Sequence, residues 1–140
     1  MAIWQADFEV LIPSCGLPAD YRLAVAQVLP PGKSWMRGLE VWGTEEGDRI
    51  DVFTKPGSPP EVLARFDLRE WKPAIYEDFL VLVRSVRGQL RTAESGAEVA
   101  ATFEDFTRTL LESRAARFVQ DPRAYLDDLK KHPIEWPEEP

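Results

Sequence analysis

Apolar and polar residues alternate between Ile3 and Ile12, where Trp4, Phe8 and Val10 are separated by polar side chains. A period of two places successive side chains on opposite faces of an extended chain. This segment is therefore predicted to be a strand with one buried face.

Three shorter apolar segments follow, each bounded by turn-forming residues. They are Leu39 to Gly43, Arg49 to Thr54 and Val62 to Leu68. Because the connections between them are short, they are predicted to form an antiparallel meander.

Helical spacing of apolar residues predicts the other elements. Gly88 is well placed to end the helix that starts at Pro73. A small hairpin is predicted between Gln89 and Ala101. The expected helices begin at Pro18, at Pro73, at Thr102 (running through Phe118) and at Pro122.

These elements predict a single α+β domain over residues 1–132. Its mainly antiparallel sheet has about five strands, with three to four helices packed on one face. An acidic, proline-rich tail follows at residues 133–140. A chain of 140 residues is long enough to bury one proper core.

The charge balance is acidic, with 24 Asp and Glu against 17 Lys and Arg, a net charge of -7 and a pI near 4.8. Negative charge disfavours attraction to phosphate backbones and anionic membranes, so neither nucleic acid nor membrane is expected as a partner. The chain has no signal-like start, no long apolar run and a single cysteine, Cys15. These features predict a cytoplasmic protein.

Catalytic chemistry has little support in the residue types present. One histidine, His132, and one cysteine do not provide a catalytic triad or a zinc site. No glycine motif for phosphates or dinucleotides occurs. We expect no cofactor, no metal and no catalytic residue. An enzyme built on a carboxylate pair is the alternative, with candidate members Asp7, Glu9, Asp51 and Asp67.

Arg84, Arg87 and Arg91 follow one another at spacings of three and four residues. They are candidates for a small anion site. The apolar residues between them already supply a buried stripe, so we interpret the arginines as the solvent-exposed face of an amphipathic helix.

The alternation sorts the strand residues onto two faces, and we take the more apolar set, including Leu39 and Val41, as buried. The other face then holds five acidic residues and one basic residue, with large aromatic residues among them. Aromatic side chains anchor protein interfaces, and surrounding charge steers an oppositely charged partner. The predicted binding residues are Asp7, Glu9, Glu40, Trp42, Asp51, Phe53 and Asp67. The alternative is that the proline-rich loop or the tail covers Trp42 and Phe53.

This surface favours a non-catalytic protein-binding domain, of the kind in which an immunity protein masks a basic toxin or effector. The element order from Pro18 to Phe118 resembles that of small acidic bacterial chaperones that hold secreted effectors. That resemblance implies an effector chaperone as an alternative function. A homodimer formed through the same face is a further alternative.

Overall fold

The computed structural model describes residues 2–131, which form six strands and five helices. His132 and the predicted tail at 133–140 lie outside the described residues. In chain order, the elements are β1 (Gln5–Leu11), α1 (Tyr21–Ala26), β2 (Leu39–Gly43), β3 (Arg49–Phe53), β4 (Glu61–Asp67), α2 (Pro73–Ser85), β5 (Gln89–Thr92), β6 (Glu98–Val99), α3 (Phe103–Glu112), α4 (Arg114–Gln120) and α5 (Pro122–Lys131).

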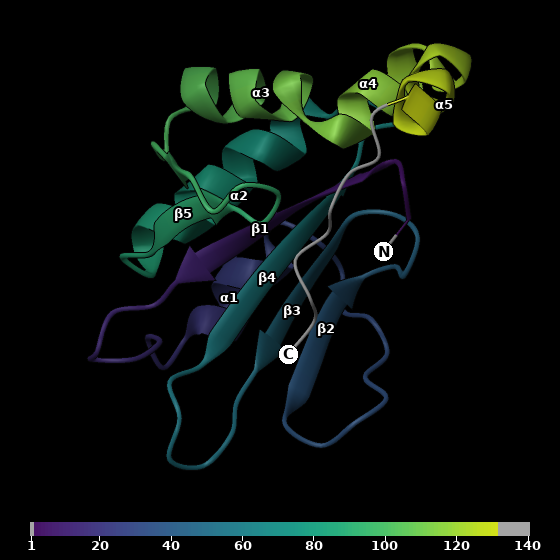
Figure 1. Cartoon of the computed structure of the whole chain (residues 1–140). Helices are drawn as coiled ribbons and strands as arrows, with labels where there is room; N and C mark the ends of the chain where they lie inside the picture. The colour runs from purple at the N-terminus through teal and green to yellow at the C-terminus, as the bar shows by residue number, and fades with distance from the viewer. Residues whose placement is uncertain (1, 132–140) are drawn as a thin grey trace.

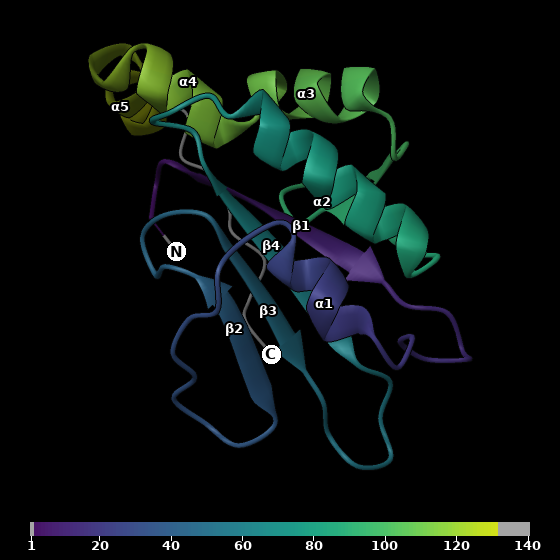
Figure 2. The same cartoon turned by 180° about the vertical axis from the view of Figure 1, so that it is seen from behind.

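All six strands join one antiparallel sheet with the order β2-β3-β4-β1-β5-β6. The predicted meander is present as β2, β3 and β4, and the long strand β1 lies in the interior of the sheet. Helices α1 and α2 lie against one face, while α3 and α4 run along one end of the sheet (Figures 1 and 2). The prediction of a single α+β domain with a mainly antiparallel sheet is confirmed.

Aromatic rings form the centre of the core between the sheet and the helices. Phe66 on β4 contacts the ring of Phe79 on α2 at a centroid distance of 4.9 Å and that of Phe106 on α3 at 5.4 Å. Phe8 on β1 and Tyr76 on α2 complete the cluster, and all five side chains are almost fully buried. Edge-to-face contacts of this kind add to the stabilisation from apolar burial.

The helix predicted from Thr102 through Phe118 is divided in two, which corrects the sequence-based prediction. Ser113 has an extended backbone and ends α3, and its hydroxyl accepts a hydrogen bond from the Ala116 amide at the start of α4. The first amides of a helix have no backbone acceptor within the helix, and the Ser113 side chain supplies one at the N-terminus of α4. The apolar spacing continues across the break, which hides it in the sequence.

The end of α2 also differs in detail from the prediction. Arg87, rather than Gly88, has the left-handed backbone conformation, with φ of 54°. Its amide donates to the Arg84 carbonyl at 3.1 Å, and the Gly88 amide donates to the Val83 carbonyl at 2.9 Å. This is the Schellman pattern of helix termination. Gly88 is required for a different reason, because a Cβ there would lie 2.4 Å from Cγ1 of Val10.

The faces of β2 are opposite to the predicted ones. Trp42 lies opposite Ile50, which in turn lies opposite the fully buried Ala64. Directly opposed residues in an antiparallel pair share a face, so Trp42 points toward the helices. The predicted inward positions of Leu39 and Val41 are therefore wrong, as are the predicted outward positions of Glu40 and Trp42.

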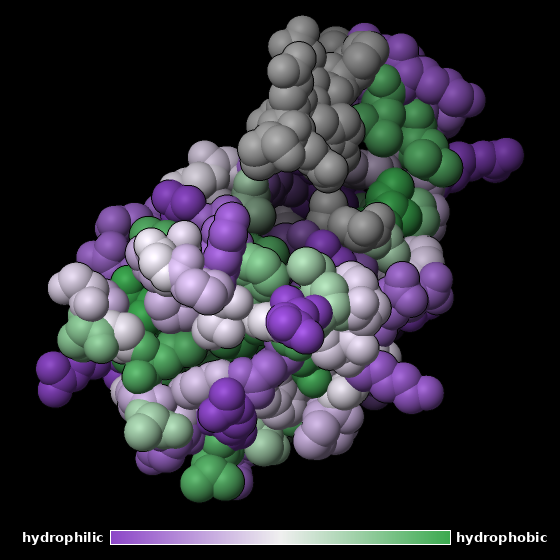
Figure 3. Space-filling view, turned by 90° about the horizontal axis from the view of Figure 1, so that it is seen from below, coloured by the Kyte–Doolittle hydropathy of each residue, from purple (hydrophilic) through white to green (hydrophobic). Residues whose placement is uncertain are grey.

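The end of the molecule that is lowest in Figure 1 carries small apolar areas separated by polar and charged residues (Figure 3). Among residues 2–131, no helix has both the length and the apolar character needed to cross a membrane.

Candidate protein-binding face

One face of the sheet has no helix against it in the described part of the chain (Figure 1). We call it the outer face and define it by strand register. Its members are Gln5, Asp7, Glu9, Leu11, Leu39, Val41, Arg49, Asp51, Phe53, Glu61, Leu63, Arg65, Asp67, Gln89, Arg91 and Glu98. Five of the seven predicted binding residues are in this set: Asp7, Glu9, Asp51, Phe53 and Asp67.

The other two predicted binding residues lie on the side of the helices. Trp42 is part of the core and 6% exposed. Glu40 accepts hydrogen bonds from the Tyr21 hydroxyl and from Nε of Arg22, the latter at 2.6 Å. Burial opposes ionisation of Glu40, but the bonds from Arg22 and Tyr21 outweigh it and lower the pKa of the carboxyl. Glu40 therefore ties α1 to the edge strand β2.

Arginines hold the remaining predicted carboxylates. Asp51 receives two hydrogen bonds from Arg49, at 2.7 and 2.6 Å, and both side chains are largely buried. Further pairs join Arg65 to Asp7 at 3.3 Å, Arg91 to Glu9, and Arg69 to Asp67 at 2.8 Å.

The charge of the outer face is therefore smaller than the sequence suggested. The strands place six acidic residues on it, namely Asp7, Glu9, Asp51, Glu61, Asp67 and Glu98, against the three arginines Arg49, Arg65 and Arg91. Six minus three leaves an excess of three negative charges, where five against one had been predicted. Arg69, just beyond the end of β4, pairs with Asp67, so two of these three negative charges remain uncompensated. They belong to Glu61 and Glu98, which form no ion pair with another described residue.

Asp7 has a buried carboxylate oxygen on the outer face. Its Oδ1 atom is buried and accepts no hydrogen bond within residues 2–131, although Nε of Arg65 lies 3.3 Å away. Burial raises the pKa of Asp7, and the positive charge of Arg65 only partly opposes this effect. Arg65 therefore offsets only part of the cost of burying the Asp7 carboxylate.

The structure adds Trp35, in the loop between α1 and β2, which the sequence analysis did not select. Its indole ring lies over the guanidinium of Arg49, 4.6 Å from the ring centroid, and Arg49 is itself held by Asp51. Trp35 nevertheless remains 63% exposed. Strand periodicity does not identify binding residues in loops. The sequence does, however, show a tryptophan among polar and turn-forming residues, which could have indicated an exposed aromatic side chain.

Other exposed apolar side chains belong to the same part of the molecule. Met36 follows Trp35 and is 50% exposed, and Leu63 stands on the outer face of β4 at 37% exposed. Phe53 is half-buried at the end of β3. The combination is an apolar anchor with paired charges around it, as at many protein interfaces.

The arrangement does not favour the carboxylate-pair enzyme. Each of the four candidate carboxylates is in an ion pair with an arginine of its own. Between residues 2 and 131, no group of three or more histidine, cysteine or acidic side chains is placed to hold a metal ion.

Comparison of the chain with models of protein families, with curated proteins and with solved structures gave no match. Its function is therefore argued from the outer face and the residues around it.

Proposed function

We propose that this chain is a non-catalytic protein-binding domain of the immunity type, which masks a basic toxin or effector with its outer face. The observation that carries the proposal is the position of Trp35. An exposed indole is held on this side of the sheet by a largely buried ion pair.

Rigidity makes Trp35 suitable as an anchor. Binding normally costs the conformational entropy of the side chains that become fixed, about 0.5–1.5 kcal/mol for each flexible one. Arg49 already restricts one face of the Trp35 ring, so less of that freedom is lost when a partner covers the other face. Tryptophans in such positions are frequent interface hot spots.

The electrostatic contribution comes from the uncompensated acids and from the whole chain. Paired carboxylates such as Asp51 have their arginines and add little attraction to a new partner. Glu61 and Glu98 on the outer face, together with the net charge of -7, favour the approach of a basic protein. Association should therefore slow as salt is added, because screening shortens the range of this attraction.

The test starts with affinity capture from the native host by the full chain, with the captured proteins identified by mass spectrometry. The binding constant of a captured basic protein is then measured for the full chain and for Trp35→Ala. We expect the substitution to weaken binding by a factor of about 30 or more, the usual effect of a hot spot. The chain should also abolish the activity of the captured protein.

A matched control variant is Leu23→Ala, which removes an apolar side chain that is 71% exposed on α1, on the other side of the sheet. It should bind as tightly as the original chain. Unchanged binding by a folded Trp35→Ala protein would remove the proposed site. Capture of an unfolded effector segment by a dimer of this chain would replace the immunity function with that of a chaperone.

A further inference from the structure

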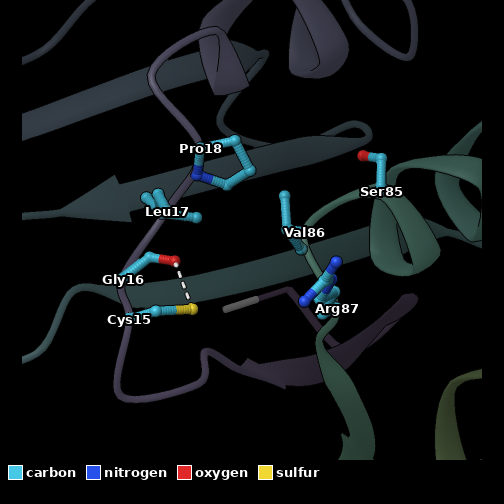
Figure 4. A pocket seen from close by; sticks show the side chains of 7 residues that line it. All are labelled: Cys15, Gly16, Leu17, Pro18, Ser85, Val86 and Arg87. Atoms are coloured by element: carbon cyan, nitrogen blue, oxygen red, sulfur yellow. Dashed lines mark hydrogen bonds between the residues drawn. The ribbon is translucent and has the colours of Figure 1, made fainter.

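A pocket of about 320 Å³ lies away from the outer face, between the loop that precedes α1 and the end of α2. Residues 15–18 form one wall, and residues 85–87 form the other (Figure 4). Small-molecule sites have volumes of about 300–1,000 Å³ and combine an apolar lining with a few polar groups. This pocket is at the small end of that range.

The charge in this pocket is opposite to that of the chain as a whole. Arg87 lines it, and no acidic residue does. Within residues 2–131, Arg87 has no ion pair, whereas four arginines near the outer face are all paired with carboxylates. The guanidinium is therefore available to an anion, and its planar donors suit a carboxylate.

Three carbonyl groups near the end of α2 already accept hydrogen bonds. The Leu82 carbonyl accepts from the Val86 amide and from the Ser85 hydroxyl. The Val83 carbonyl accepts from the Gly88 amide, and the Arg84 carbonyl accepts from the Arg87 amide. These three carbonyl groups are therefore not left unbonded beside the pocket. Arg87 supplies the formal charge of the pocket.

Leu17 and Val86 supply the apolar part of the pocket. Both side chains also border a small interior cavity whose lining is wholly apolar, so they separate the pocket from the core. We propose that the pocket binds a small carboxylate with a short apolar tail, with the carboxylate on Arg87 and the tail across Leu17 and Val86. Neither Trp35 nor the outer face takes part in this site.

Cys15 on the rim of the pocket allows a direct test, because it is the single cysteine of the chain and is exposed. The rate at which iodoacetamide alkylates Cys15 is followed by intact mass, with and without octanoate. A ligand of this size is expected to bind with a dissociation constant on the order of 1–10 mM. Saturating octanoate should slow the alkylation about threefold or more, while acetate and butan-1-ol at equal concentration should have much weaker effects.

The decisive variant is Arg87→Gly, which removes the guanidinium and keeps a residue that favours the left-handed backbone at this position. Protection by octanoate should require about tenfold more ligand, the usual effect of losing a charge-assisted hydrogen bond. Arg123→Ala, on α5 at the other end of the molecule, should leave protection unchanged (Figure 2). The proposal is overturned if octanoate does not slow the alkylation, or if a folded Arg87→Gly protein is protected as well as the original chain.

Discussion

Two tryptophans close together in the sequence should differ widely in their contribution to stability. Trp42 is 6% exposed and belongs to the core, whereas Trp35 is 63% exposed in a loop. If β2 were displaced by one residue relative to β3, every side chain of the strand would change face and Trp42 would point outward. Replacing each tryptophan by alanine therefore tests the register of β2.

The expected magnitudes follow from the buried area of each side chain. A buried tryptophan removes about 150–250 Å² from water, which at about 25 cal/mol per Å² corresponds to about 4–6 kcal/mol. Because alanine keeps part of this burial, Trp42→Ala should lower the free energy of unfolding by about 3–5 kcal/mol. Trp35→Ala loses only the partly covered face of the ring and its contact with Arg49, and should cost about 1–2 kcal/mol.

Urea unfolding followed by far-ultraviolet circular dichroism measures both values without relying on tryptophan fluorescence. The slope of the free energy against urea should be similar in the two variants. Equal costs for the two substitutions, or a cost below about 1.5 kcal/mol for Trp42→Ala, would show that the assignment of β2 to its faces is wrong.

Three further predictions concern α1 and the end of α2. Burial and the bond to Glu40 raise the pKa of Tyr21 to about 12, so the unfolded chain loses this proton first, near pH 10. Stability should therefore be fully retained below about pH 10 and fall as pH rises toward 12, and Tyr21→Phe should make the measured decline shallower. Arg87→Gly should raise the free energy of unfolding by about 0.5–1 kcal/mol, because it relieves a left-handed arginine. Gly88→Ala should lower it by about 1–3 kcal/mol through the contact with Val10, and thermal unfolding of the two variants measures both effects.

The strands and most helix ends were predictable because they depend on local patterns. The alternation around Phe8, the turns of the meander and the proline at the start of α2 each act within a few residues. The full order of the sheet was not predicted, because the pairing of β1 with both β4 and β5 joins distant parts of the chain. The break at Ser113 was also missed, since the apolar spacing of a single helix continues through it.

The candidate face was harder to predict because β2 has apolar residues on both sides. Leu39 and Val41 alternate with Glu40 and Trp42. A rule that buries the set with more apolar residues places Leu39 and Val41 toward the core, whereas the structure places Trp42 there. Two tertiary contacts determine which face of the sheet each β2 residue occupies. Trp42 packs in the core, and Glu40 lies beside Tyr21 and Arg22. Local pattern does not contain them.

The paired charges of the outer face determine which of its residues would contribute to the proposed binding. A carboxylate already held by an arginine, such as Asp51, attracts a new basic group weakly, and separating the pair to accommodate one would leave a largely buried ion without its partner. Strength and selectivity would therefore come from apolar contacts around Trp35, while Glu61, Glu98 and the net negative charge mainly affect the rate of encounter. On the proposed function, the pair formed by Arg49 and Asp51 would position the exposed indole of Trp35 before any partner arrives.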